Sequence, residues 1–288
     1  MKKFQLFFVL LFFVFAAFKS DKPAYSLFNK VGKEVKYSKM LKEIQGADIV
    51  LFGESHDNPI SHWLQLELTT DLFELKNENL VLGAEMFESD NQVILNEYLD
   101  SLISQKSFEA EARIWPNYKT DYKPLVEFAN KNRLNFVATN VPRRYASLVN
   151  SKGFEGLEEL SDAAKTFIPP LPIDYDSTLN CYKSMMEMEG MGPHVTENFP
   201  KSQAIKDATM AYFILKNWSP GKMLIHYHGS YHSENFESIY WYLKMANPEL
   251  NIVTIHTVSQ SDVSELSEEN VGLADYTICV DEDMTKTR

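Results

Sequence analysis

Short apolar runs alternate with amphipathic stretches of helical length along most of this chain, and no other feature constrains its fold as strongly. Such alternation predicts βα units, and therefore an α/β fold with a mostly parallel central sheet flanked by helices. The predicted strands cover residues 48–53, 80–85, 134–139, 222–228, 251–257 and 276–280. The predicted helices cover residues 60–76, 91–104, 122–132, 203–218 and 235–245.

The segment of about residues 154–200 interrupts this alternation. Its prolines, Pro169, Pro170 and Pro172, cannot continue a helix, and helix-like pieces at 157–167 and 177–189 lie on either side of them. We therefore expect a helical insertion over the carboxyl-terminal edge of the sheet. The rest of residues 30–288 is predicted to form a single α/β domain around it.

The first residues have the features of a secretory signal. Lys2 and Lys3 precede an apolar run over residues 4–18, and the end of this run contains the small residues Ala16 and Ala17. The run is shorter than the roughly 20 residues that a membrane-spanning helix needs. We expect a signal peptide at residues 1–17 and an exported protein that is periplasmic or membrane-associated. No cysteine follows the run closely, so a lipid-anchor site is not expected.

The chain is acidic, with a formal net charge of −12, or −14 (−12 − 2) without Lys2 and Lys3. Negative charge disfavours nucleic acid as a partner but leaves room for a small ligand in a locally basic pocket. Cys181 and Cys279 are the only two cysteines, and either a disulfide or two separate buried thiols would suit an exported protein. Their spacing does not predict a thiolate metal site.

Polar and ionisable residues follow four of the predicted strands at the point where each strand ends. They are Glu54 and His56, Glu85, Asn140 with Arg143 and Arg144, and His228 with His232. In a parallel sheet these positions emerge at the same edge, which is where α/β proteins bind ligands. The sequence therefore predicts one polar crevice built from four strands.

The histidines of the run ending at 228 differ in their expected roles. His226 and His228 share one face of the strand, and Tyr227 points to the other. We expect His226 to be a core residue and His228 to belong to the site, beside Gly229, which lets the backbone approach a ligand. His62 is expected to pack rather than to bind.

A second group of candidate residues lies outside the strand ends. Trp115 offers a flat apolar surface, and Tyr118 and Tyr122 could ligate ferric iron or cover a flat ligand; alternatively, this loop only caps the following helix. His194, which follows a Gly-Pro pair, is a better ligand candidate than the methionines at 185–191, whose spacing suits adaptable packing.

Six short motifs, in this order, resemble those of the ChaN-like haem-binding proteins of the Tiki/TraB/erythromycin-esterase superfamily. They lie at residues 52–58, 84–87, 115–124, 140–143, 207–211 and 228–232, and the resemblance extends over about residues 37–280. It implies an exported α/β protein in haem or iron uptake or storage, with haem held in a homodimer. It also implies tyrosine and histidine near the iron, with an outer-membrane haem or iron receptor as a further candidate partner.

Two functions from different classes follow. As a haem-binding protein, the chain would use apolar surfaces, tyrosine or histidine donors and cations for the propionates. The expected cofactor-binding residues are Tyr118, Tyr122, Asn140, Arg143, Arg144, His194 and His228.

The alternative is a metal-dependent hydrolase. The resemblance matches two Gly-x-x-His motifs, ending at His56 and His232, and a glutamate, Glu85, to the superfamily's hydrolase centre. These three residues would hold a divalent ion with an open position for water, and Glu54 or Glu85 would be the catalytic base. The same residues could also hydrolyse an ester without metal, or the crevice could be a binding scaffold that has lost its chemistry.

Overall fold

Seven strands form one sheet in the computed structural model, which describes residues 22–187 and 196–287. The order across the sheet is β1-β7-β6-β2-β5-β3-β4, and every neighbouring pair is parallel except β1 with β7. The strands are β1 (Tyr25–Asn29), β2 (Ile49–Glu54), β3 (Leu80–Glu88), β4 (Phe136–Asn140), β5 (Met223–Gly229), β6 (Ile252–Gln260) and β7 (Tyr276–Asp281). The predicted α/β fold with a mostly parallel sheet is confirmed.

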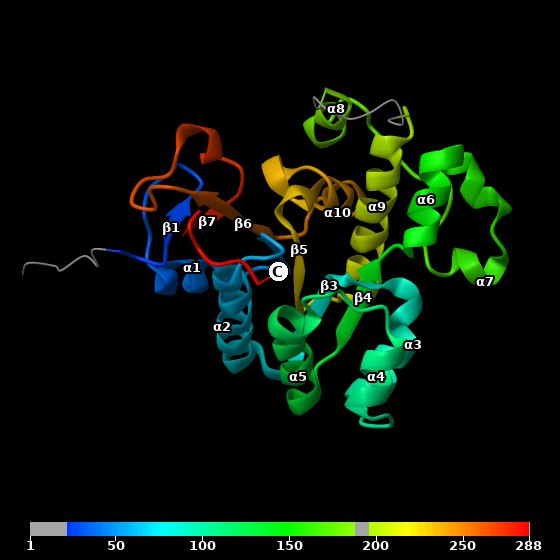
Figure 1. The fold of residues 1–288 in the computed structure, drawn as a ribbon, viewed down its shortest axis with the longest axis horizontal. Helices are drawn as coiled ribbons and strands as arrows, with labels where there is room; N and C mark the ends of the chain where they lie inside the picture. Colours follow the sequence, from blue (N-terminus) through cyan, green and yellow to red (C-terminus); the bar gives the residue numbers. More distant parts are fainter. Residues whose placement is uncertain (1–21, 188–195, 288) are drawn as a thin grey trace, which may run out of the picture.

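Helices cover both faces of the sheet (Figure 1). They are α1 (Tyr37–Ile44), α2 (Pro59–Lys76), α3 (Gln92–Leu99), α4 (Gln105–Glu111), α5 (Lys123–Asn132), α6 (Arg143–Lys152), α7 (Asp162–Lys165), α8 (Asn180–Glu187), α9 (Phe199–Asn217) and α10 (Ile239–Ala246). Buried side chains of α1 to α5 pack on one face, and those of α9 and α10 pack on the other.

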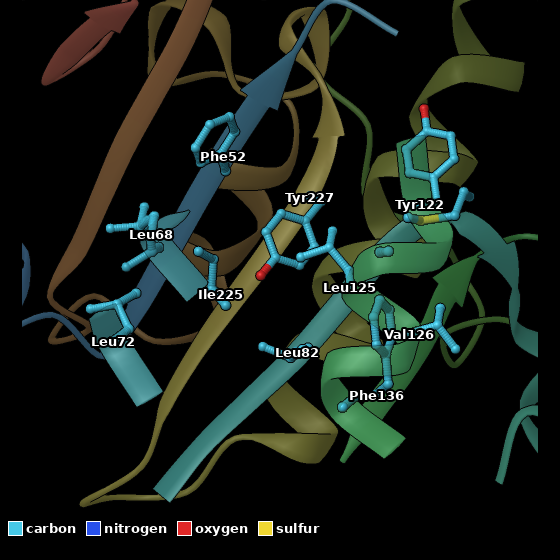
Figure 2. Packing of buried hydrophobic residues seen from close by; sticks show 14 of the residues in the cluster. Phe52, Leu68, Leu72, Leu82, Tyr122, Leu125, Val126, Phe136, Ile225 and Tyr227 are labelled. Atoms are coloured by element: carbon cyan, nitrogen blue, oxygen red, sulfur yellow. The ribbon is translucent and has the colours of Figure 1, made fainter. Parts of the chain in front are cut away.

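The core on the first face is continuous across the central strands. Figure 2 shows Leu68 and Leu72 of α2 and Leu125 of α5 packed beside Phe52 and Tyr227, which come from β2 and β5. Because α2 directly follows β2 and contacts β2, β3 and β5, the loop between β2 and α2 is connected to elements that are fixed in the core.

All six predicted strands are confirmed, whereas several other elements differ from expectation. β1 and helices α1, α4 and α6 were not predicted. The helix expected over residues 91–104 ends at Leu99, because Ser101 has a positive φ of 59°. The helix expected over 157–167 is broken, since Leu160 is extended and the Ser161 hydroxyl starts a new helix by accepting a bond from Ala164 N.

The segment expected as a helical insertion contains α7 and α8. Cys181 and Tyr182 of α8 pack against Ala204 of α9, so this end of the segment is fixed to the sheet-flanking helix. Cys181 and Cys279 are separate, buried, free thiols. The predicted signal peptide at 1–17 and His194 lie outside the described residues. Within residues 22–187 and 196–287, no helix has the length and apolar character needed to cross a membrane.

Candidate functional site

Glu54, the last residue of β2, is the centre of a buried hydrogen-bond network. Its side chain is 3% exposed. Oε1 accepts bonds from His56 Nδ1 at 2.9 Å and from the Tyr122 hydroxyl at 2.5 Å, and Oε2 accepts one from Gln65 Nε2 at 2.5 Å. Burial favours the neutral form of Glu54, but the hydrogen bond from His56 and the charge of the nearby His62 hold the pKa of Glu54 below the ordinary value. It is therefore an ionised carboxylate with three donors.

His56 is oriented by this carboxylate. Its Nδ1 faces Glu54, which leaves Nε2 on the opposite side of the ring. The side chain is 35% exposed, and its ring meets Trp115 edge to face with centroids 4.9 Å apart. Burial alone would lower the pKa of His56, but the bond to Glu54 and the charge of Glu85 raise it above the ordinary value.

The backbone of His56 is also fixed. Its carbonyl oxygen accepts a bond from Asn117 Nδ2 at 2.8 Å and lies 3.1 Å from His62 Nε2. His62 comes from the buried face of α2, where its Nδ1 lies 3.1 Å from Gln65 Oε1. His62 thus contacts the backbone of His56 and does not line the pocket itself.

Glu85 of β3 and the turn after β5 form the second part of the site. The Gly229 amide donates to Glu85 Oε2 at 2.8 Å, and His232 Nε2 lies 3.3 Å from Glu85 Oε1. On its other side, His232 Nδ1 lies 2.5 Å from Asp207 Oδ1 of α9. The imidazole therefore stands between two buried carboxylates.

The charges in this second group are mutually dependent. Burial would lower the pKa of His232, but Glu85 and Asp207 raise it to about 10. Burial raises the pKa of Glu85, yet the charge and hydrogen bond of His232 outweigh it and hold that pKa below the ordinary value. His232 is therefore an imidazolium at neutral pH, and both of its nitrogens are donors.

One pocket brings the two groups to solvent. It has a volume of about 660 Å³, within the usual range for small-molecule sites. Its lining mixes apolar, cationic and acidic side chains: Ile114, Trp115, Pro116, Val141, Ala146, Arg113, Arg143, Lys206, His56, Asn140, Glu85 and Glu88. Of the predicted site residues, His56, Glu85, Asn140 and Arg143 therefore share one cavity.

Other predicted site residues have different positions. Tyr118 is 1% exposed and packs against Phe87 and Phe108 in the main core. Burial raises the pKa of the Tyr118 phenol well above the ordinary value. For Tyr122, burial and the nearby charge of Glu54 together raise the pKa of the phenol. Neither tyrosine lines the pocket.

His228 and Arg144 also lie away from the pocket. Because strand residues alternate, Tyr227 faces α2, and His228 faces the opposite side, where it lies 3.0 Å from His226 and 2.9 Å from Ser233 Oγ. The Arg144 guanidinium pairs with Asp90 at 2.6 Å. His226 is fully buried, as expected.

The contributors to the site that were not predicted include Gln65, Lys206, Asp207 and Arg113. The burial of Gln65 could have been predicted, because polar residues recur at 62, 65 and 69, on the face of α2 that also buries Leu68. Lys206 and Asp207 belong to α9. Asp207 begins the family motif at 207–211, but no site role was predicted for it. Arg113 lies on a loop.

The donors do not form a metal centre as they stand. Within the described parts of the chain, no three His, Cys, Asp or Glu side chains are grouped so that they could hold a metal ion. The reason is visible in the predicted set of His56, Glu85 and His232, because both nitrogens of His232 are directed at carboxylates. The geometry gives the divalent-ion alternative no support.

Comparison with known families decides the relationship. Residues 40–243 match the family of haem-binding uptake proteins of the Tiki superfamily, ChaN. The chain belongs to this family. The resemblance noted from the six sequence motifs is thereby confirmed.

Known relatives agree with the fold. The ChaN protein of Campylobacter jejuni, solved with cofacially bound haem, is 18% identical, with a TM-score of 0.67 over 88% of this chain and 96% of that one. At this identity the likeness shows the fold. An erythromycin esterase is more distant, at 12% identity and a TM-score of 0.47 over 89% of this chain and 83% of the esterase.

Protein RETICULATA-RELATED 5, chloroplastic, of Arabidopsis thaliana is 25% identical over 220 residues, which are 71% of this chain. The match covers 29% of the length of that plant protein.

Proposed function

We propose that this protein binds haem in the 660 Å³ pocket, and that it serves haem or iron acquisition or storage after export. Membership of the ChaN family supports the ligand, as does the haem bound by the Campylobacter relative. The observation that carries the proposal is the composition of one cavity: a nitrogen donor, an apolar wall and unpaired cations lie around the same space.

The apolar wall and the cations suit the two parts of a haem molecule. Ile114, Trp115 and Val141 provide surface for a porphyrin face. Arg143 and Lys206 line the same pocket, and neither has an ion-pair partner among residues 22–187 and 196–287. They can therefore pair with propionates, whereas the Arg113 guanidinium is already paired with Glu88 and Asp90.

His56 is the donor that we assign to the iron. Glu54 holds its Nδ1, so the other nitrogen is the one available to a ligand, and imidazole is a common axial ligand of haem iron. The bound haem would supply the iron centre. The protein's own contribution is to orient the imidazole and to pair the propionates.

A hemin titration of the purified protein, followed at the Soret band, tests this assignment. We expect saturable binding by the wild type, a loss or shift of the Soret band in His56→Ala, and a hemin Kd about tenfold higher in Lys206→Ala. Lys216→Ala is the matched control, because Lys216 is exposed on the same helix and packs over Tyr212. Absence of a saturable Soret change in the wild type would refute the proposal.

Two adjacent arginines sharpen the test. Arg143 lines the pocket, whereas Arg144 pairs with Asp90 and lies over the ring of Tyr145. Arg143→Ala should therefore raise the hemin Kd more than Arg144→Ala does. The reverse order would place the propionates elsewhere.

The partners that we propose are a second copy of this chain and an outer-membrane haem or iron receptor. The resemblance to the ChaN-like proteins implies haem held in a homodimer, and haem binds cofacially to the Campylobacter relative. Sedimentation of the protein with and without hemin tests the first partner: hemin should convert monomer to dimer. A monomer at saturating hemin would contradict it.

A second candidate function is ester hydrolysis without metal, and the Glu54–His56 pair favours it. A carboxylate-oriented imidazole in a residue that lines a pocket is suited to act as a general base. The hydrolysis of p-nitrophenyl esters, compared between the wild type and His56→Asn in metal-free buffer, tests it. Equal rates in the two proteins would end this alternative.

A further inference from the structure

The residues after β7 extend back to the loop that carries His56. Figure 1 shows this segment, in red, leaving the β1 and β7 edge of the sheet and returning past the top of α2 toward the middle of the molecule. Met284 packs, partly buried, against the main hydrophobic core. The segment is thereby anchored before it reaches the site.

Residues 286 and 287 contact the neighbour of His56 directly. The Thr287 amide donates to the Asp57 carbonyl oxygen at 2.9 Å, and Lys286 Nζ lies 3.5 Å from an Asp57 carboxylate oxygen. Both contacts fall on the residue that follows His56 in the chain. The Lys286 pair is largely exposed and contributes little, whereas the backbone bond has a fixed geometry.

The Thr287 hydroxyl is also linked to the His56 carbonyl, through Asp121 and Asn117. It donates to Asp121 Oδ2 at 2.7 Å. The same oxygen accepts a bond from Asn117 Nδ2 at 2.6 Å, and Asn117 Nδ2 also donates to the His56 carbonyl at 2.8 Å. Asp121 is 3% exposed, so this carboxylate depends on its few protein donors.

We propose that Thr287 is a positioning residue for His56. It fixes the loop at Asp57 through its amide and fixes Asp121 through its hydroxyl, and Asp121 in turn orients the amide group that holds the His56 carbonyl. The inference rests on the proposed function only in assigning His56 to the ligand. Loss of the Thr287 hydroxyl removes one donor from a buried carboxylate and loosens the Asn117 to His56 contact.

The test uses three variants of the purified protein. Thr287→Val removes the hydroxyl at nearly constant size, and Thr287→Ser retains it. Thr285→Val is the matched control, because Thr285 is exposed and its hydroxyl forms no hydrogen bond with the described residues. The readouts are the His56 imidazole resonances, assigned by their absence in His56→Gln, amide exchange of residues 55–58, and the hemin Kd.

We expect Thr287→Val to move the His56 resonances, to speed amide exchange at residues 55–58, and to raise the hemin Kd about tenfold. Thr287→Ser should behave like the wild type in all three measurements, and Thr285→Val should change none of them. Unchanged His56 resonances in Thr287→Val, equal shifts at all histidines, or a serine variant that behaves like valine would each overturn the proposal. If the wild type fails to bind hemin, the proposed function falls, and the resonances and amide exchange still decide the role of Thr287.

Discussion

A Cβ atom on Gly229 would lie 2.8 Å from Nε2 of His56, closer than nonbonded carbon and nitrogen can approach. Two Gly-x-x-His motifs that are far apart in the sequence therefore meet in space, the glycine of one against the histidine of the other. The absence of a side chain at 229 is what leaves room for the imidazole beside Glu85.

Replacement of Gly229 by alanine should displace the His56 ring. The new methyl group would collide with Cε1 and Nε2 of the ring and displace the imidazole from its present position, and we expect the hemin Kd to rise about tenfold. Gly46→Ala is the control, since the nearest atom to a Cβ there is 3.9 Å away. Hemin titration of both variants checks this, and a Gly229→Ala protein with wild-type affinity would show that the ring can move without cost.

Replacement of Asp207 by asparagine should destabilise the fold. It removes a charge from a completely buried carboxylate that pairs with His232 and accepts a bond from the Tyr182 hydroxyl at 2.9 Å. Because Glu85 still pairs with His232 in this variant, we expect the loss of the charge-assisted bond at Asp207 to cost about 1.5–3 kcal/mol in the free energy of unfolding. Lys183→Ala, which removes an exposed pair with Glu187, should cost less than about 1 kcal/mol. Urea unfolding of the two variants measures both, and equal costs would contradict the argument.

The free energy of unfolding should depend on pH through His232. Its pKa is raised to about 10 in the folded protein, against about 6.5 in an unfolded chain. A raised pKa stabilises the folded state fully below the unfolded value, and this stabilisation is lost as the pH rises through the folded value. The stability difference between the wild type and His232→Gln should therefore shrink from pH 6.5 to pH 10. Thermal unfolding across this range measures it, and a constant difference would contradict a charged His232.

Two buried tyrosines should respond oppositely to loss of their hydroxyls. The Tyr122 hydroxyl donates to the Glu54 carboxylate, so Tyr122→Phe should cost about 1.5–3 kcal/mol in the free energy of unfolding. The Tyr118 hydroxyl is buried with no hydrogen-bond partner in the described part of the chain, so Tyr118→Phe should be neutral or stabilising. Neither hydroxyl lines the pocket, and Tyr118→Phe should leave the Soret band of bound hemin unchanged. A shifted band would return Tyr118 to the iron site.

The sheet was predictable from the sequence because its central strands are buried on both faces and read as continuous apolar runs. β1 was not, since it is a short antiparallel edge strand whose register is set by β7, more than 240 residues further along the chain. The break at Leu160 depends on one capping hydroxyl, and local hydrophobic periodicity does not report it.

The edge of the sheet that carries the site was also predictable, whereas the direction of each side chain was less so. His56 and Glu85 follow their strands into the pocket, but His228 is turned away by the alternation that places Tyr227 against α2. The carboxylate that pairs with His232 Nδ1 comes from α9. Asp207 lies in the family motif at 207–211, but hydrophobic periodicity alone does not show that its side chain faces the strand ends.

The position of β5 has a consequence for synthesis of the protein. β5 lies between β2 and β3 in the sheet, although it follows both by well over a hundred residues in the chain. A nascent chain that has not yet exposed residue 229 cannot close the sheet, and it has no partner for the Glu85 carboxylate at the Gly229 amide. Under the proposed function, a chain that ends before β5 is therefore expected not to bind the ligand.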